Sequence, residues 1–493
     1  MDLALLELAS SAPAFAQSDA RFYRRSDRIC CGSWTDHPHA VIDRTQLRVH
    51  DLGSLDQTVM ELANGKINFN LPMLPEALRR QAQELEQRGW IVPCERGAEA
   101  DPIRTYPNHL ILAVKWGITG RCNFRCRHCF VSAPDARFGE LPLEDCLRII
   151  REMAEIGVQA VTLTGGEPLV REDFFRIVDE LVKNNIQITM IATNGALVTD
   201  RLLDQLEARG CKPGFAMSFD GVGWHDWLRG IPGAEKQLMG KFELLAHRGY
   251  YTSSAMTLHR KNVGVLRETV NRLADVGVSY AIVNRMLDLG EWQKYGEGLT
   301  LSQAEIFRAY LDYLPQFFAD GMPIRVTLNR ILSLHRGSYD YEILPIKPPC
   351  SFAKRPVCSD AHRIPMILGD GRLVPCIAIA GMDGMQESFP DLTKLHLRDA
   401  VEHSRLAELT GTTIEAHQQA NPKCTACPYH RWCQGGCPAQ ALEFDDTNYN
   451  GVDYLRCEFF ENHWADQILR RMQEISPQTH CTNLPADFPL LDR

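Results

Sequence analysis

The sequence predicts an α/β protein built around a parallel sheet with helices on its outside. Between residues 111 and 285, short apolar runs typical of strands alternate with helical patterns, which is the order of a parallel sheet made of βα units. Polar or glycine-rich residues follow several of these strands directly, and three cysteines follow the first one. Because the carboxyl ends of parallel strands meet at one edge, we expect a functional site there.

Six strand candidates and five helix candidates make up this central region. The strand candidates are residues 111–118, 160–164, 187–193, 215–219, 252–257 and 280–284. The helix candidates are residues 143–156, 173–184, 200–209, 234–248 and 265–276. Six βα units are fewer than the eight of a closed barrel.

Composition and charge limit the class of protein. The 493 residues exceed one typical domain, and length alone suggests about three. The net charge of -9 does not favour nucleic-acid binding. No apolar run approaches the ~18 residues of a membrane span, and the acidic N-terminal stretch is unlike a signal peptide. We therefore expect a cytoplasmic protein with no membrane or nucleic-acid partner, in which 17 cysteines indicate metal or redox chemistry.

The three cysteines after the first strand are Cys122, Cys126 and Cys129, with the spacing C-x3-C-x2-C. A four-iron cube normally takes one thiolate for each iron, so three local thiolates leave one iron uncovered. An open coordination position distinguishes a reactive metal site from a structural one. A zinc knuckle or three unrelated thiols are the alternatives that this motif alone leaves open.

Three further strand ends carry polar or glycine-rich segments, at residues 165–168 (GGEP), 193–195 (TNG) and 218–221 (SFDG). Together with the cysteine motif, this pattern resembles the radical S-adenosylmethionine (SAM) enzymes. The resemblance implies a partial (β/α)6 barrel and a [4Fe-4S] cluster on the three cysteines. It also implies reductive cleavage of SAM to methionine and a 5′-deoxyadenosyl radical, which abstracts hydrogen from a substrate.

The same resemblance implies which residues bind SAM. Gly165, Gly166 and Glu167 would hold the amino group, where a carboxylate complements an ammonium. Ser218 would contact the ribose or the carboxylate of SAM. Arg229 would hold the carboxylate, because a guanidinium fits that geometry.

Four further residues flank this predicted site. His128 and Phe130 lie beside the cluster cysteines, where the family often places an aromatic ring near adenine. Asn194 and Asp220 are candidates for SAM contacts, but a capping or turn role explains them about equally well. No catalytic base or proton donor can be named. Charged residues after the sixth strand could reach the cavity, although surface charges are the simpler interpretation: Arg285, Asp288 and Glu291.

A second group of eight cysteines lies within 108 residues near the C-terminus. Eight thiolates would ligate two more cubes, while the CxxC pair also suits zinc. The order Gly-x4-Cys, C-x2-C-x5-C-x3-C and a distal cysteine resembles the SPASM extension of radical SAM enzymes. The resemblance implies a first auxiliary [4Fe-4S] cluster on Cys350, Cys358, Cys376 and Cys437. It implies a second one on Cys424, Cys427, Cys433 and Cys457.

An N-terminal module is predicted between residues 39 and 93. Residues 39–51 are strand-like, residues 55–64 and 75–88 are amphipathic helices, and residues 89–93 end in a short strand. This order resembles a winged helix, and similar modules in SPASM enzymes recognise a leader peptide by adding it to a sheet edge. DNA binding and simple packing are alternatives. The first is not favoured, since Lys and Arg do not outnumber Asp and Glu here.

These observations divide the chain into four predicted parts. A winged-helix-like peptide-recognition module with an N-terminal extension covers residues 1–105, and the partial barrel covers residues 106–340. The SPASM domain covers residues 341–470, and a tail covers residues 471–493. We expect the module to bind a precursor peptide with a leader. We expect a flavodoxin or ferredoxin to supply electrons.

Three functions follow from these parts. The first is a maturase that installs a thioether or C–C cross-link in a ribosomally made peptide. The second is a sulfatase-type maturase that forms formylglycine, or an enzyme for another substrate. The long stretch before Cys122 and the residue Ile377 after Cys376 depart from the sulfatase-maturase pattern. The third is a non-catalytic electron relay, which would need no uncovered iron. The sequence favours the first.

Overall fold

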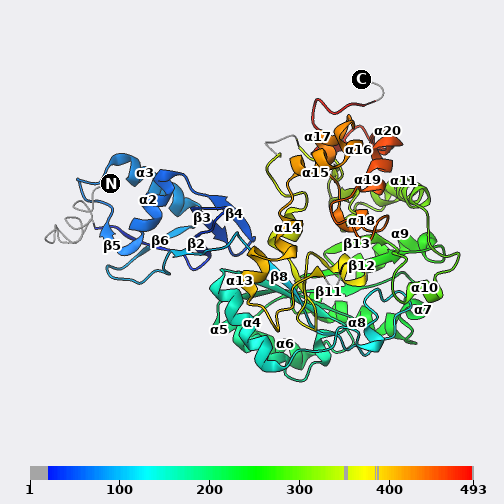
Figure 1. Cartoon of the computed structure of the whole chain (residues 1–493), viewed down its shortest axis with the longest axis horizontal. Coiled ribbons are helices and arrows are strands. Elements are labelled where there is room, and N and C mark those ends of the chain that lie inside the picture. The colour runs from blue at the N-terminus through cyan, green and yellow to red at the C-terminus, as the bar shows by residue number, and fades with distance from the viewer. Residues whose placement is uncertain (1–19, 349–352, 383–384, 386–387, 491–493) are drawn as a thin grey trace. The chain divides into compact units, whose positions relative to one another are not determined.

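A computed structural model describes residues 20–348, 353–382, 385 and 388–490. The chain forms two compact units (Figure 1). The first extends to Leu112 and includes Glu155–Gln159, and the second contains Ala113–Ala154 and the chain from Ala160 onward. No helix in the described part is long and apolar enough to cross a membrane.

The first unit contains two small sheets and two helices. One sheet has the order β5-β1-β6, and the other has the order β4-β3-β2-β7. The strands are β1 (Phe22–Arg25), β2 (Ile29–Ser33), β3 (Ala40–Asp43), β4 (Arg48–Asp51), β5 (Asn64–Asn68), β6 (Ile91–Cys94) and β7 (Arg104–Thr105). The helices are α2 (Ser54–Leu62) and α3 (Glu76–Gln87). Their apolar faces meet the first sheet in a core that includes Tyr23, Leu85 and Trp90.

This unit is larger than the predicted module of residues 39–93. The central strand of the three-stranded sheet is β1, which precedes that segment. The segment predicted to be strand-like at residues 39–51 does form strands, but two of them, the antiparallel pair β3 and β4. The turn between them contains no glycine, and Leu47 adopts the left-handed conformation at φ 49° instead. The two helices and the closing strand lie where they were predicted.

The second unit is built on one twelve-stranded sheet, whose consecutive strands β8 to β14 are all parallel. Its first six strands lie at the six predicted positions: β8 (Ala113–Thr119), β9 (Ala160–Gly165), β10 (Gln187–Thr193), β11 (Gly214–Ser218), β12 (Thr252–Leu258) and β13 (Tyr280–Arg285). The predicted βα order is confirmed, and a seventh parallel strand, β14 (Arg325–Leu328), extends it.

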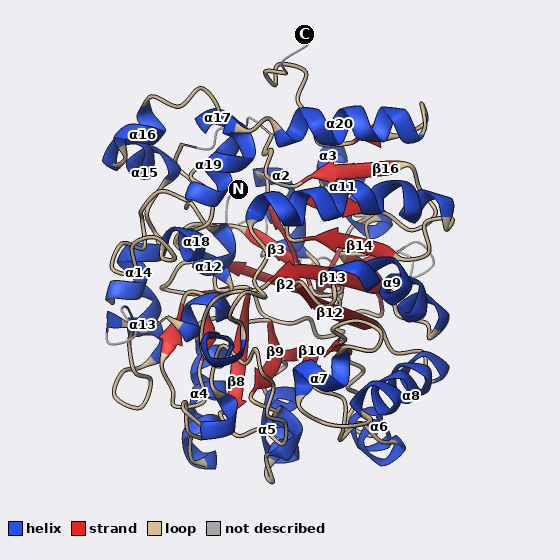
Figure 2. Ribbon diagram, turned by 90° about the vertical axis from the view of Figure 1, so that its right-hand side faces the viewer, coloured by secondary structure: helices blue, strands red, loops and turns tan. Residues whose placement is uncertain are grey.

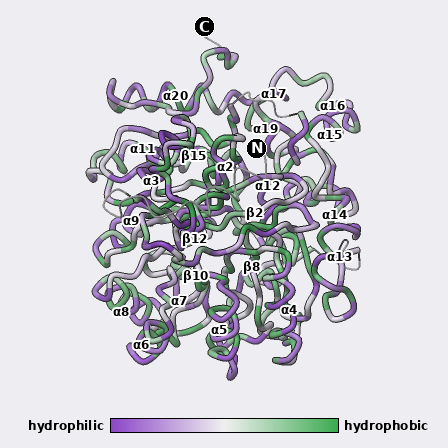
Figure 3. The backbone as a smooth tube through the Cα atoms, turned by 90° about the vertical axis from the view of Figure 1, so that its left-hand side faces the viewer, coloured by the Kyte–Doolittle hydropathy of each residue, from purple (hydrophilic) through white to green (hydrophobic). Residues whose placement is uncertain are grey.

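Helices surround these strands on the outside (Figure 2). Five of them confirm the predicted helices: α4 (Leu143–Glu155), α5 (Phe174–Lys183), α6 (Asp200–Glu207), α8 (Ala234–His247) and α9 (Leu266–Asp275). In Figure 3, α6 and α8 change between hydrophilic and hydrophobic colour along their length, as amphipathic helices do. Their apolar residues, such as Leu203 and Phe242, are buried.

The rest of the second unit extends the sheet and adds short helices. The further strands are β15 (Leu332–Leu334), β16 (Asp340–Ile343), β17 (Met366–Ile367), β18 (Leu373–Val374) and β19 (His480–Cys481). The longer helices are α11 (Gln303–Ala319), α19 (Tyr454–Glu461) and α20 (Trp464–Ile475). The shorter ones are α7 (His225–Arg229), α10 (Trp292–Tyr295), α12 (Ser359–Arg363), α13 (Leu397–Glu402), α14 (Arg405–Thr410), α15 (Ile414–Ala420), α16 (Pro422–Thr425), α17 (His430–Cys433) and α18 (Pro438–Ala441).

Candidate functional site

The loop after β8, which we call the cluster loop (residues 120–132), brings three thiols together. Burial raises the pKa of Cys122 to about 11, and the neighbouring Cys126 and Cys129 contribute to that rise. The backbone N–H of Phe124 donates to Cys122 Sγ at 3.4 Å, and that of Ala133 donates to Cys129 Sγ at 3.3 Å. Such donors favour thiolates, which are the metal-binding form of cysteine. The donor set therefore fits an iron–sulfur cluster.

Helix α7 holds the cluster loop through a buried ion pair. Arg229 Nε donates to Asp220 Oδ2 at 2.7 Å, and Arg229 Nη1 lies 3.6 Å from Cys126 Sγ. Burial alone would raise the pKa of Asp220, but Arg229 holds that pKa below its usual range. Asp220 is thus the counter-ion of Arg229, and the guanidinium adds positive charge beside a cluster thiol. Contact of Arg229 with SAM stays a prediction.

Backbone contacts fix the same loop at two other points. The N–H of Arg127 donates to the carbonyl of Leu228 on α7 at 2.8 Å. The N–H of Glu291 donates to the carbonyl of Cys129 at 3.0 Å. Segments far along the chain therefore help to fix the conformation of the loop, together with its internal bond from Cys129 N to Cys126 O.

The GGE segment after β9 lies directly against the cluster loop. Gly166 N donates to Thr119 O at 2.9 Å, and Glu167 N donates to Arg121 O at 2.8 Å. A Cβ on Gly166 would lie 2.3 Å from Arg121 O, which leaves room only for glycine. Gly165 has φ 141°, which also favours glycine. These glycines bring the second strand end into contact with the first.

The carboxylate of Glu167 is fully buried and is used inside the protein. It accepts hydrogen bonds from Thr193 Oγ1 at 2.8 Å, from Asn194 N at 2.7 Å and from Leu169 N at 3.1 Å. Burial raises its pKa, against the effect of these donors. Glu167 therefore ties the GGE segment to the end of β10. Binding of the SAM amino group by this segment stays a prediction, with Glu167 as the residue that positions it.

The other predicted SAM contacts lie at the same edge of the sheet. Ser218 is the half-buried last residue of β11, and Asn194 Nδ2 donates to Asn123 Oδ1 of the cluster loop at 2.7 Å. Phe130 is half-buried. Burial, followed by the charge of Arg229, lowers the pKa of His128 to about 3, so its ring is neutral. The Nδ1 atom of His128 is buried without a hydrogen-bond partner among the described residues.

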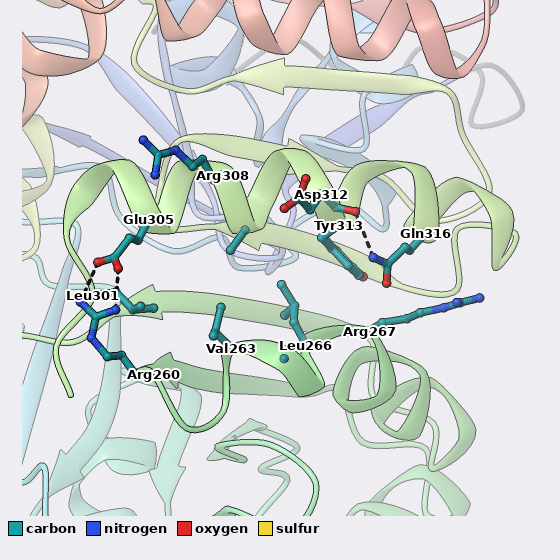
Figure 4. A pocket seen from close by; sticks show the side chains of 12 residues that line it. Arg260, Val263, Leu266, Arg267, Leu301, Glu305, Arg308, Asp312, Tyr313 and Gln316 are labelled. Carbon is teal, nitrogen blue, oxygen red and sulfur yellow. Dashed lines mark hydrogen bonds and ion pairs between the residues drawn. The ribbon is translucent and has the colours of Figure 1, made fainter. Parts of the chain in front are cut away.

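A cavity of about 660 Å³ lies beside the cluster loop. Asp288 and Glu291 line it together with Ser132 and Leu442. Arg285, at the end of β13, forms an ion pair with Glu443, which also lines the cavity. Asp288 and Glu291 thus line a cavity, although surface charge was the favoured interpretation of the sequence. A second cavity of about 520 Å³, between the start of α9 and α11, has no predicted site residue in its lining (Figure 4).

The thiols of the C-terminal cysteines influence one another's pKa, which indicates which of them lie near one another. Burial raises the pKa of Cys437 to about 11, and Cys376 and Cys358 contribute. Burial likewise raises the pKa of Cys433 to about 12, with contributions from Cys457 and Cys424. Cys427 contributes to the raised pKa of Cys424. The eighth predicted ligand, Cys350, lies outside the described residues.

No three His, Cys, Asp or Glu side chains in the described ranges form a group that would enclose a single metal ion. A cube needs no such group, since each of its thiolates binds a different iron. Assignment of the individual cysteines to clusters stays a prediction.

One carboxylate that sequence reasoning missed connects the two cysteine groups. Asp453 is buried, and its Oδ2 accepts the N–H of Cys437 at 2.9 Å. Its Oδ1 accepts the N–H of Arg456 at 2.9 Å and so caps helix α19, which carries Cys457. An Asp directly before the first residue of a helix is a known capping signal, but the bond to Cys437 depends on the tertiary structure.

The fold and the thiol-bearing loop together define an iron–sulfur enzyme of the parallel α/β class. Residues 116–275 match the family model of the radical SAM superfamily. The mycofactocin maturase MftC of Mycobacterium ulcerans is 31% identical over 358 residues, which cover 69% of this chain and 86% of that protein. The chain belongs to the radical SAM superfamily.

Two further comparisons extend this result. An AdoMet-dependent heme synthase of Methanosarcina barkeri is 31% identical over 173 residues, and the chain covers 49% of its length. The crystal structure of Streptococcus suis SuiB bound to its precursor peptide SuiA matches with a TM-score of 0.60 and 16% identity. That match covers 89% of this chain and 100% of SuiB, so the two proteins share a fold along most of their length.

Proposed function

We propose that this enzyme is a peptide maturase that uses SAM to abstract hydrogen from a ribosomally made precursor peptide and forms a thioether or C–C cross-link. The observation that carries the proposal is that a single chain contains both the cluster loop and an N-terminal unit whose four-stranded sheet ends in an open edge. The names of its relatives support it, because MftC is a maturase and SuiB was crystallised with a precursor peptide.

The roles of the site residues follow from their contacts. When bound, SAM and a reduced cluster supply the 5′-deoxyadenosyl radical that abstracts hydrogen. The three cluster-loop thiols hold the cluster, and Arg229, fixed by Asp220, offers its charge to the SAM carboxylate. The GGE segment, fixed by Glu167, positions the amino group.

The C-terminal region is proposed as a SPASM domain with two auxiliary [4Fe-4S] clusters. The two cysteine groups and the carboxylate of Asp453 between them support this assignment. Full cysteine ligation favours clusters that accept the electron released when the product forms. The four-part division at residues 105, 340 and 470 is retained as part of the proposal, although β17 and β19 contribute to the central sheet.

The N-terminal unit is proposed to bind the leader of the precursor peptide as an added strand. Strand β4 pairs only with β3 among the described strands, and three of its four residues are exposed. In an antiparallel ladder, every second residue of a strand forms hydrogen bonds to the partner strand. Leu52 N donates to His39 O, so His50 is also bonded to β3, whereas Val49, between these positions, is not. Val49 therefore directs its N–H away from β3, toward an incoming strand.

Replacing Val49 with proline is expected to weaken leader binding about tenfold or more. Proline removes the outward N–H and leaves every hydrogen bond between β4 and β3 in place. Edge strands tolerate proline at such a position. Val49→Ala keeps the N–H and serves as the matched control. Fluorescence anisotropy of a labelled leader measures the affinity, and circular dichroism checks the fold. Equal affinities for the two variants would exclude β4 as the leader edge.

The proposal is tested by the intact mass of the precursor peptide after anaerobic co-expression with the enzyme. Cross-linking removes two hydrogens, so the mass should fall by about 2 Da, and fragmentation should locate the bond. An unchanged peptide with continued formation of 5′-deoxyadenosine would favour another substrate. The heme synthase relative makes a tetrapyrrole the second candidate, although its match covers only 34% of this chain.

A further inference from the structure

The surface around helix α7 and the cluster loop carries positive side chains that lack acidic partners. We call Arg125, Arg127 and Lys261 the basic patch. Arg125 and Lys261 are exposed, and Arg127 is half-buried. None of the three forms an ion pair in the part of the chain that the structure describes. Arg127 and Lys261 lie over the same ring, that of Trp227, at 5.0 Å and 4.3 Å from its centroid.

The basic patch belongs to the cluster loop itself. Arg125 and Arg127 flank the cluster ligand Cys126 in sequence, and Arg127 Nε donates to the carbonyl of Trp227 at 2.9 Å. The Arg127 guanidinium also lies 5.1 Å from the centroid of the Tyr295 ring, and Tyr295 is 46% exposed. Cations packed on a half-buried and an exposed aromatic residue thus adjoin the loop that carries Cys126.

Neighbouring charges do not cancel the basic patch. The carboxylate of Asp226 on α7 is engaged by the N–H groups of Gly233 and Glu235, at 2.6 Å and 2.7 Å. Arg260 precedes Lys261 in sequence but points into the second cavity, where it pairs with Glu305 (Figure 4). Arg125, Arg127 and Lys261 therefore present unpaired positive charge to solvent.

We infer that the basic patch is the docking surface for an acidic protein electron carrier of the flavodoxin or ferredoxin type. This inference rests on the proposed function, which requires a one-electron reduction of the cluster before SAM is cleaved. The reduced carrier loses one electron and the cluster gains it, and no bond forms or breaks in this step. A positive surface steers a negative partner and fixes its orientation. Arg125 and Arg127 each adjoin Cys126 in sequence, so a partner docked on them is one residue along the chain from a cluster thiol.

The test compares two ways of reducing the same enzyme. A flavodoxin with its reductase supplies electrons in one assay, and photoreduced deazariboflavin, a small uncharged donor, supplies them in the other. The variants are Arg125→Glu with Lys261→Glu, and Lys261→Glu alone, which leaves the cluster loop unchanged. Arg176→Glu is the matched control, because Arg176 is an exposed arginine on α5 without a described ion-pair partner.

The rate of 5′-deoxyadenosine formation with flavodoxin is expected to fall about tenfold or more in the double variant at low salt. The rate with deazariboflavin should stay unchanged in Lys261→Glu, which leaves the cluster loop intact, and Arg176→Glu should match the wild type in both assays. Raising the ionic strength should slow the wild type with flavodoxin and have little effect on the double variant. Iron content and visible spectra show that each variant retains its clusters.

Unchanged flavodoxin-driven rates in both patch variants would overturn the inference. Equal losses with both reductants, accompanied by weaker binding of the peptide, would also overturn it and assign the patch to the substrate. A wild-type enzyme that cleaves no SAM with deazariboflavin would instead contradict the proposed function on which the inference rests.

Discussion

Replacing Cys122, Cys126 and Cys129 together with alanine should abolish the formation of 5′-deoxyadenosine. The three thiols are the protein ligands of the proposed SAM-binding cluster, and the N–H donors of Phe124 and Ala133 are directed at two of them. Cys126 and Cys129 are among the main contributors to the raised pKa of Cys122, so the three thiols lie close together. Without the cluster, the enzyme has neither the electron source nor the iron that would bind SAM, so no 5′-deoxyadenosine should form.

Iron analysis distinguishes this loss from general unfolding. The triple variant should fall from about 12 to about 8 irons per chain, because the two auxiliary clusters keep their own ligands. Cys211→Ala is the control, since Cys211 is half-buried and lies outside the predicted ligand sets. It should retain full iron and full activity. Formation of 5′-deoxyadenosine by the triple variant at the wild-type rate would refute the assignment of the cluster loop.

Replacing Asp453 with alanine is expected to destabilise the C-terminal cysteine region more than any other single change to a carboxylate there. The variant loses the cap of α19, which costs about 1 kcal/mol. It also removes the acceptor of the part-buried N–H of Cys437, which costs about 0.5–1.5 kcal/mol more. Because Cys437 and Cys457 belong to different groups, both auxiliary clusters should lose iron while SAM cleavage persists.

The asparagine variant provides the matched comparison. Asn caps helices about as well as Asp, so Asp453→Asn should retain α19 but weaken the bond to Cys437. Its melting temperature should lie between those of the wild type and Asp453→Ala. Iron content, and absorbance near 400 nm, follow the clusters. Wild-type iron and stability in Asp453→Ala would show that this carboxylate does not hold the two groups together.

The fold could be predicted where local pattern and tertiary environment agree. Strand β10 begins and ends at the predicted residues, because its β-branched and apolar residues lie between Asn185 and the pair Asn194-Gly195, which are turn signals. Helix α7 was not predicted, since five residues show no helical periodicity. The antiparallel pair β3–β4 was missed because Leu47 takes a turn conformation that usually indicates glycine.

The candidate site could be predicted in its residue types but not in its internal contacts. The spacing of the cysteines predicted the cluster loop, while the assignment of the C-terminal cysteines to two clusters stays a prediction. Glu167, however, bonds to the end of another strand, Thr193, and Asp220 pairs with Arg229 across the turn into α7. Asp453 bonds to Cys437, which lies sixteen residues earlier. Such pairs depend on how loops meet, which no local pattern encodes.

The central claim, that this enzyme abstracts hydrogen from a peptide, is tested most directly by isotope transfer. The purified enzyme would be reduced anaerobically and incubated with SAM and a uniformly deuterated precursor peptide. Mass spectrometry of the 5′-deoxyadenosine should then show one deuterium, with a matching loss from the peptide. 5′-Deoxyadenosine that forms at the same rate without deuterium would contradict the account, because its hydrogen would come from elsewhere.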